Sequence, residues 1–243
     1  MKQIYTGQEY AQILYDIFQN NDTYYAWGAW GAYAGYSGNK DRYKVSAAPD
    51  DCFLFDCSGF AYKAIPWGWN GSRTKNGGAS YKKEGFEALE TNNILALCSD
   101  VSEDFEDIQI GELVYLPGHV GIYIGSGEVI ECTSAWENGV MITACDNVGG
   151  SPIKYHRSWT KHGKLPFIKY EAKDNSSSDD LKETEKDMIL EIDTGISYLE
   201  AARDNFGEAQ ECLTVAMDHI TQAIIAFNNL DEMIEKFFGG LKK

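Results

Sequence analysis

The sequence predicts an α+β protein in which N-terminal helices pack on an antiparallel sheet and a C-terminal helical tail follows. Three patterns support this class: a helical period over residues 7–20, short strand-like runs from residue 110 onward, and a heptad repeat within residues 181–243. In the first segment, apolar side chains recur at the spacing of one helix face, at Tyr10, Ile13, Leu14, Ile17 and Phe18. We therefore expect an amphipathic helix over residues 7–20.

The segment between this helix and residue 110 predicts a loop, a strand and a short helix. Residues 24–39 are rich in Gly, Tyr and Trp and have neither a helical nor a strand period, so they predict a loop anchored by aromatic side chains. Residues 53–55 are apolar and strand-like, and a short helix over residues 59–65 follows until Pro66 ends it. Cys57 lies at the start of that short helix.

From residue 110 onward the pattern changes to short strands separated by Gly, Pro and Asn. The expected strands cover residues 112–116, 119–124, 128–133, 140–144 and 165–170. Their spacing fits an antiparallel sheet.

The chain divides into an N-terminal domain of residues 1–171, a polar linker of residues 172–180 and a helical tail of residues 181–243. Apolar residues fill every d position of the tail heptads from Ile192 to Ile234. Polar residues at some a positions and Gly207 near the middle leave two forms open, one long helix or a helical hairpin. The heptads predict a coiled coil that joins copies of the chain through residues 181–237, with a wall-binding or partner-binding helix as the alternative.

Composition limits the classes of partner. The formal net charge of −16 argues against binding to nucleic acid or to an anionic membrane surface. The six cysteines form no CxxC pair, so most are expected to be free thiols. The start of the sequence resembles no signal peptide and no apolar run reaches membrane-spanning length, so we expect a protein of the producing cell's cytoplasm without a membrane partner.

Cys57 is the first candidate for catalysis, because an apolar strand leads through Asp56 directly into a helix that begins at this thiol. Unpaired backbone N–H groups at a helix start can hold an oxyanion. A helix N-terminus and a nearby imidazolium each lower the pKa of a thiol, and we expect both effects at Cys57.

His119 is the candidate base, since it opens a strand after a Pro-Gly turn and has small neighbours. Its strand returns through Gly125-Ser126-Gly127. A three-residue turn there pairs residue 124 with residue 128 and places Glu131 opposite Gly121, on the same face as His119. Glu131 can then orient the imidazole. A two-residue turn would instead place Glu131 on the other face.

Three motifs in this order carry a family resemblance, and a fourth segment precedes them. They are Phe55-Asp56-Cys57-Ser58-Gly59-Phe60, Gly118-His119-Val120-Gly121-Ile122-Tyr123-Ile124-Gly125 and Gly127-Glu128-Val129-Ile130-Glu131, with Tyr24-Tyr25-Ala26-Trp27-Gly28 upstream. Together they resemble the NlpC-type superfamily of papain-like cell-wall peptidases over residues 5–170. The segments Glu131-Cys132-Thr133 and 159–166 resemble in particular the lysins of phages that infect Gram-positive bacteria.

The resemblance implies a papain-like fold, no metal or other cofactor, and cleavage of peptidoglycan stem peptides, commonly beside D-glutamate and a diamino acid. By position, it makes Cys57 the nucleophile, His119 the base and Glu131 the third member of the site. Tyr25 supplies a hydroxyl close to the thiol, and we expect it to assist the oxyanion. Ser58 and Trp27 complete the expected oxyanion-binding and substrate-binding set at these motifs. Such an enzyme acts on the wall after release from the producing cell.

Two other functions stay open. Many family members carry His as the third residue, whereas CHAP-type enzymes combine Cys and His with an acidic or amide residue, so Glu131 also fits a CHAP-type N-acetylmuramoyl-L-alanine amidase or cross-bridge endopeptidase. A structural tail-assembly protein with a spent papain-like domain is the non-enzymatic alternative. The other cysteines and His156, His162 and His219 have no motif support, and Trp67, Trp69 and Arg73 either line a peptide groove or fold an insertion.

Overall fold

The computed structural model describes residues 4–171 of the 243-residue chain. Its helices are α1 (Gly7–Asn20), α2 (Asn39–Tyr43), a π-helix (Gly59–Lys63), a 3-10 helix (Lys83–Gly85) and α3 (Thr91–Leu97). Its strands are β1 (Tyr5–Thr6), β2 (Thr23–Tyr25), β3 (Trp30–Tyr33), β4 (Phe53–Phe55), β5 (Ser99–Ser102), β6 (Leu113–Leu116), β7 (His119–Gly125), β8 (Glu128–Thr133), β9 (Gly139–Cys145), β10 (His156–Arg157), β11 (Lys161–Lys164) and β12 (Ile168–Lys169). The α+β class is confirmed. The linker at 172–180 and the helical tail at 181–243 lie outside the described residues and stay predictions.

Helix α1 has the predicted bounds, and a capping box fixes its start. The Thr6 hydroxyl accepts a hydrogen bond from the Glu9 N–H at 3.2 Å, and the Glu9 carboxylate accepts one from the Thr6 N–H at 2.7 Å. Its apolar face is buried at Tyr10, Leu14 and Ile17. This face forms part of the main core, as the sequence period predicts.

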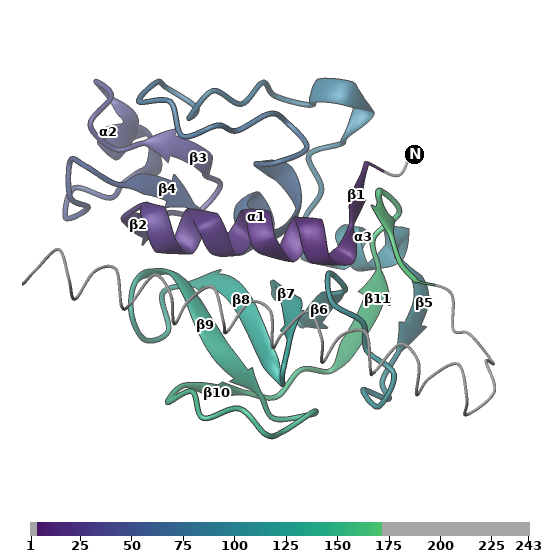
Figure 1. The fold of residues 1–243 in the computed structure, drawn as a ribbon. Helices are drawn as coiled ribbons and strands as arrows, with labels where there is room; N and C mark the ends of the chain where they lie inside the picture. Colours follow the sequence, from purple (N-terminus) through teal and green to yellow (C-terminus); the bar gives the residue numbers. More distant parts are fainter. Residues whose placement is uncertain (1–3, 172–243) are drawn as a thin grey trace, which may run out of the picture. The chain divides into compact units, whose positions relative to one another are not determined.

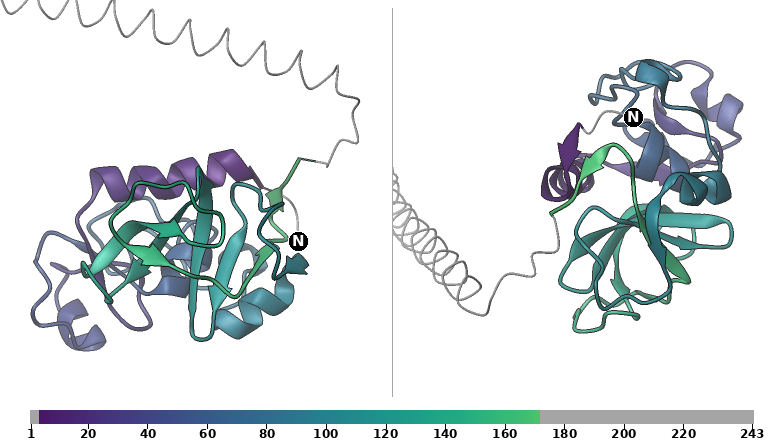
Figure 2. Two further views of the ribbon diagram at one scale, coloured as in Figure 1. Left: turned by 90° about the horizontal axis from the view of Figure 1, so that it is seen from below. Right: turned by 90° about the vertical axis from the view of Figure 1, so that its right-hand side faces the viewer.

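The strands form a seven-stranded sheet in the order β10-β9-β8-β7-β6-β11-β5 and a three-stranded sheet in the order β2-β4-β3. The large sheet is antiparallel except where β10 runs parallel to β9. Figure 1 shows the large sheet in one half of the domain and the small sheet with α2 in the other, and the right-hand view of Figure 2 separates the same two halves. A small third sheet joins β1 to β12.

The two faces of the large sheet contact different apolar clusters. The main core includes Val120, Ile122, Ile130 and Cys132 on one face, together with α1. The opposite face has its own smaller cluster of Phe105, Val114, Tyr123, Val129, Cys145 and Trp159. Since side chains alternate along a strand, His119 and Glu131 share the face of this smaller cluster.

Residues 24–39 are not a plain loop, which corrects the sequence prediction. They include most of β2 and all of β3, and α2 begins at Asn39. Strand β2 pairs parallel with β4, and β3 pairs antiparallel with the same strand. The short strand β3 is buried at Trp30, Gly31 and Ala32, so it shows no alternation of polar and apolar residues.

The end of the domain also differs from the prediction. Only Ile168–Lys169 of the expected strand 165–170 is extended, and it pairs with β1 outside the large sheet. The large sheet instead takes up β11, between β6 and β5. The strands expected at 112–116, 119–124, 128–133 and 140–144 are confirmed within one residue at each end.

Five cysteines within the described part of the chain are free, as expected: Cys52, Cys57, Cys98, Cys132 and Cys145. Cys132 points away from Glu131 into the main core, where it is buried. No helix within residues 4–171 is long and apolar enough to cross a membrane.

Candidate functional site

Asp56 sets the geometry of the turn that carries Cys57. One carboxylate oxygen, Oδ1, accepts hydrogen bonds from the Gly59 N–H at 2.5 Å and from the Ser58 hydroxyl at 2.9 Å. The other oxygen, Oδ2, accepts from the Gly28 N–H at 2.8 Å. Asp56 therefore caps the helix that starts at Cys57 and ties it to the segment after β2.

Gly59 is required in the same turn by a close backbone approach. A Cβ atom at this position would lie 1.9 Å from the Ala29 carbonyl oxygen, well inside van der Waals contact. Because the Asp56 N–H also donates to the Ala29 carbonyl at 2.8 Å, this segment fixes the passage from strand to helix on two sides. The short helix continues as a π-helix, in which the Ala64 N–H donates to the Gly59 carbonyl at 2.8 Å.

The Cys57 thiol is buried, at 4% exposure, and its electrostatics differ from the expectation. Burial and then the Asp56 charge raise the pKa of Cys57 to about 11, against the opposing effect of the Val120 and Ser58 N–H groups and the Lys63 charge. The expected lowering of this pKa is therefore wrong. The physical reason is burial of the thiol first and then the Asp56 carboxylate at the helix start, which together outweigh the N–H groups that would favour a thiolate.

His119 and Glu131 meet on the outer face of the large sheet. The distance from His119 Nε2 to Glu131 Oε2 is 2.5 Å, and the Glu131 side chain is fully buried. Burial alone would raise the pKa of Glu131, but hydrogen bonds and charge from His119 and Arg157 outweigh it and lower the pKa below its ordinary value. Glu131 is thus a carboxylate that holds Nε2 and leaves Nδ1 of His119 for a second partner.

The hairpin between these residues places Glu131 on the predicted face of the sheet, but its turn differs from the expected one. Gly125 pairs with Glu128, so the turn has two central residues, Ser126 and Gly127, which both have positive φ as in a type I′ turn. The expected three-residue turn is therefore wrong. The register shifts between Tyr123 and Gly125, and this bulge restores the parity.

The thiol lies beside the beginning of β7. The backbone N–H of Val120 is hydrogen-bonded to the Cys57 sulfur, and Gly118 lines the same cleft as Cys57. His119 stands between these two residues in the chain. The structure thus joins His119 to Glu131 on β8 and places the thiol beside Val120, the residue that follows His119 at the beginning of β7.

Tyr25 lies close enough to Cys57 for the two groups to interact electrostatically. Burial first, and then the charges of Cys57 and Asp56, raise the pKa of Tyr25 above its ordinary value. The phenol is therefore protonated at neutral pH and is a hydrogen-bond donor near the thiol.

Ser58 and Trp27 both line the cleft in front of Cys57, which has a volume of about 370 Å³. Trp27 is 76% exposed at this cleft. The Ser58 hydroxyl is already engaged, since it donates to Asp56 and accepts from Lys63 Nζ at 2.7 Å. The backbone N–H of Ser58 is hydrogen-bonded to the thiol and is therefore better placed than the hydroxyl to donate to an oxyanion.

The sequence interpretation missed three side chains around Glu131. Thr143 Oγ1 donates to Glu131 Oε1 at 2.7 Å, and Arg157 Nε donates to the same oxygen at 2.9 Å. Trp159 stacks on the His119 ring with centroids 5.7 Å apart. These residues come from β9, β10 and the following loop, so no local signal marks them. Asp56, by contrast, is a typical helix-capping residue that the sequence displays.

The other two histidines within the described residues, which have no motif support in the sequence, pair with nearby acidic side chains. His156 pairs with Asp146 at the surface, and the buried His162 is hydrogen-bonded to Glu112 and to the Asp104 carbonyl. His219 lies outside the described residues.

Trp67, Trp69 and Arg73 form contacts that hold the segment after the π-helix in place. Trp67 Nε1 donates to the Phe86 carbonyl, and Trp69 Nε1 donates to the Gly31 carbonyl. Arg73 pairs with the exposed Asp51. None of Trp67, Trp69 and Arg73 lines the cleft at Cys57.

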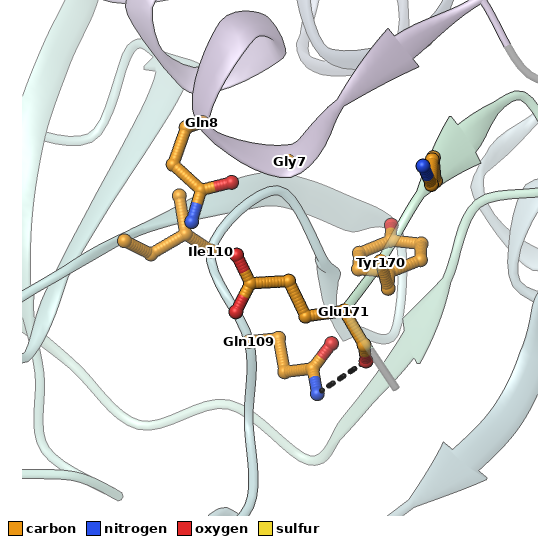
Figure 3. A pocket seen from close by; sticks show the side chains of 7 residues that line it. Gly7, Gln8, Gln109, Ile110, Tyr170 and Glu171 are labelled. Carbon is orange, nitrogen blue, oxygen red and sulfur yellow. Dashed lines mark hydrogen bonds between the residues drawn. The ribbon is translucent and has the colours of Figure 1, made fainter. Parts of the chain in front are cut away.

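A second cavity of about 190 Å³ lies between the start of α1, the loop at 109–110 and residues 169–171 (Figure 3). In it, the Gln109 amide donates to the Glu171 carbonyl at 3.3 Å. It shares no lining residue with the cleft at Cys57 and contains no Cys or His. Within residues 4–171, no three His, Cys, Asp or Glu side chains gather as a metal site.

Comparisons with known proteins give few matches. No protein-family model and no curated protein matches the sequence. The solved structures of NlpC2 and NlpC1 from Trichomonas vaginalis are similar at a TM-score of 0.38 each, with 15% and 18% sequence identity. Each similarity covers 68% of this chain, and 48% and 46% of those chains, so the chain spans about half their length. The chemistry of the site is therefore inferred from its own residues.

Proposed function

We propose that this protein is a cysteine hydrolase that cleaves an amide bond in the peptidoglycan stem peptide, with Cys57, His119 and Glu131 as nucleophile, base and orienting carboxylate. The observation that carries the proposal is the hydrogen bond between His119 Nε2 and the buried carboxylate of Glu131, on a strand whose first residues border the thiol. A buried carboxylate that fixes an imidazole beside a thiol is the arrangement required for nucleophilic catalysis.

The raised pKa of Cys57 favours general-base activation over a resting thiolate. With a pKa of about 11, only about one thiol in ten thousand is ionised at pH 7. His119 Nδ1 takes the proton as sulfur attacks the carbonyl carbon, and the new C–S bond forms with an oxyanion. The Ser58 N–H, which is hydrogen-bonded to the thiol, and the Tyr25 hydroxyl, which interacts with it electrostatically, are the proposed donors to that charge.

The second half of the reaction returns the proton. The tetrahedral intermediate collapses, the C–N bond breaks, and His119 gives its proton to the leaving amine. Water then hydrolyses the thioester at Cys57 with His119 as base, which releases the acid product and regenerates the thiol. Glu131 stays ionised and stabilises the imidazolium in both halves.

The charges in the cleft support a substrate with a carboxylate next to the scissile bond. Lys63 lines the cleft, and its ammonium donates to the neutral Ser58 hydroxyl, while no carboxylate among the side chains described in residues 4–171 forms an ion pair with it. Glu90 also lines the cleft and suits an amine on the other side of the bond. A D-glutamyl-diamino-acid bond offers both groups, so we propose endopeptidase activity at that bond. Action on the wall after release, as in phage lysins, belongs to the same proposal and rests on the motif resemblance.

Mass spectrometry of the fragments released from purified walls of several bacteria tests this function. We expect fragments with a new glutamyl carboxyl group and a new amine on the diamino acid, and none when Cys57→Ala replaces the wild type. A new lactyl carboxyl group on muramic acid would instead indicate an amidase, and cleavage in the cross-bridge would indicate a cross-bridge endopeptidase. Release of no fragment from any wall would contradict the proposal.

Substitution of Lys63 tests the substrate charge. Lys63→Met is expected to raise KM for a stem peptide about tenfold or more, because a charge-assisted hydrogen bond is lost. For a stem peptide in which the glutamate carboxylate is amidated, KM should differ little between the two proteins. Lys161→Met, at a lysine that pairs with Glu103 on the surface, serves as the control.

A further inference from the structure

Glu131 has two oxygens, and the proposed triad uses only one of them. Oε2 contacts His119, whereas Oε1 accepts from Arg157 Nε at 2.9 Å and from Thr143 Oγ1 at 2.7 Å. The charged and titratable groups that face this carboxylate are His119 from β7 and Arg157 from β10, and the neutral Thr143 comes from β9. The carboxylate is therefore shared between the His119 imidazole and a guanidinium that is always charged.

The guanidinium of Arg157 is held between two aromatic rings. Its Cζ lies 4.6 Å from the Trp136 ring centroid and 5.5 Å from the Trp159 centroid. Trp159 in turn stacks on His119 at an interplanar angle of 13°. Stacked guanidinium groups have few alternative rotamers, so Arg157 and the imidazole are held in register with each other.

Trp159 is itself fixed by Asn147. Asn147 Oδ1 accepts from the Trp159 N–H at 2.7 Å, and Asn147 Nδ2 donates to the Trp159 carbonyl at 2.9 Å. Trp159 is 3% exposed and lies in the apolar cluster on the outer face of the sheet. The stack beside His119 is thus part of the packed core and not a mobile surface contact.

We propose that Arg157 is a positioning residue that keeps Glu131 ionised throughout the reaction, so that His119 carries its proton on Nε2 and presents Nδ1 to the thiol. When His119 is neutral, a fully buried carboxylate would otherwise have no countercharge and would take up a proton. A protonated Glu131 would donate to Nε2 and invert the tautomer. The permanent charge of Arg157 prevents this, and the inference rests on the proposed function for its catalytic meaning.

Removal of the Arg157 guanidinium should shift the pKa of Glu131, and with it the pH profile of activity, in one direction. Arg157 lowers the pKa of Glu131, so Arg157→Met raises that pKa, and the acidic limb of kcat/KM against pH moves to higher pH. We expect a shift of about one pH unit, a fall in kcat of about tenfold or more and a small change in KM. Arg157→Lys keeps the charge and should keep the position of the limb, while it loses part of kcat because the planar group is gone.

The decisive experiment needs no turnover and therefore separates this inference from the proposed function. The full chain has four histidines, so ¹⁵N NMR can follow the His119 ring in a Cys57→Ala background. We expect the Nε2–H tautomer both in the chain that keeps Arg157 and in Arg157→Lys, and loss of its dominance in Arg157→Met at mildly acidic pH. If Arg157→Met does not fold, Arg157→Gln, which keeps an amide donor but no charge, carries the same expectation. An unchanged tautomer in a folded, uncharged variant overturns the proposal.

Discussion

His119 Nε2 and Glu131 Oε2 lie 2.5 Å apart although the two residues are not opposite each other in the sheet. Ile122 pairs with Ile130, so continuation of the ladder places Glu131 opposite Gly121, one diagonal step from His119. A Cβ atom on Gly121 would lie 2.6 Å from the Val129 side chain and 3.2 Å from the Trp159 ring, so glycine there leaves room for the ring that stacks on His119. This geometry leads to the first prediction.

Substitution of Glu131 should affect the chemical step more than binding. We expect Glu131→Gln to lower kcat by about 100-fold or more, because an amide neither stabilises the imidazolium nor fixes one tautomer. Glu128→Gln, which changes the same residue type on the same strand where Glu128 accepts from Ser151, is the matched control. Equal activity of Glu131→Gln and the wild type in steady-state assays would remove Glu131 from the mechanism.

Asp56 provides a test of the electrostatics at the thiol. The Asp56 charge raises the pKa of Cys57, so Asp56→Asn should lower it from about 11, while the amide oxygen can still cap the helix. Alkylation of Cys57 by iodoacetamide, followed by peptide mass spectrometry across pH, measures this midpoint. Lys63→Met should move the midpoint in the opposite direction, because the Lys63 charge favours the thiolate. Asp51→Asn, at an exposed pair with Arg73, should leave it unchanged.

His162 makes the stability of the domain depend on pH. Burial alone would lower the pKa of His162, but its hydrogen bonds to Glu112 and to the Asp104 carbonyl outweigh burial and raise the pKa above its ordinary value. A raised folded-state pKa stabilises the fold fully below about pH 6.5, and this contribution is lost as the pH rises through the folded-state value.

The free energy of unfolding, measured by urea titration between about pH 5 and pH 9, should therefore fall over the upper part of this range. His162→Gln should cost about 3 kcal/mol at pH 6, because it leaves the buried Glu112 carboxylate unpaired, and it should flatten the profile. His156→Gln, at the exposed pair with Asp146, should change neither quantity. A wild-type profile that rises with pH would show that the His162 pair does not act in this way.

The features that could be predicted from the sequence are those with local causes. Helix α1 has its period, its cap at Thr6 and its end within one segment, and it has the predicted bounds. The turn into the helix at Cys57 was visible because an apolar strand, an Asp and a Gly follow one another.

The hairpin that brings Glu131 to His119 was predicted correctly for a reason that was only partly right. The turn is shorter by one residue than expected, and the bulge before Gly125 adds that residue back. Parity depends on the total number of residues in turn and bulge, so two errors of opposite sign cancelled.

The features that could not be predicted depend on contacts between distant segments. Strand β3 is defined by its pairing with β4, and Arg157 reaches Glu131 from 26 residues along the chain. The high pKa of Cys57 depends on burial by the main core, which no local pattern reports. Charge and burial at a site depend on the tertiary structure, and they raise the pKa of Cys57 where the sequence predicts a lowered pKa.

The most direct test of the central claim is the lysis of purified cell walls by Cys57→Ala, followed as loss of turbidity together with mass spectrometry of released fragments. The account predicts that Cys57→Ala releases no fragment above the no-enzyme control while its thermal unfolding matches the wild type. Cys52→Ala, at another buried free thiol, should retain nearly full activity. Undiminished release of the same fragments by a clean preparation of Cys57→Ala would contradict the assignment of Cys57 as the nucleophile.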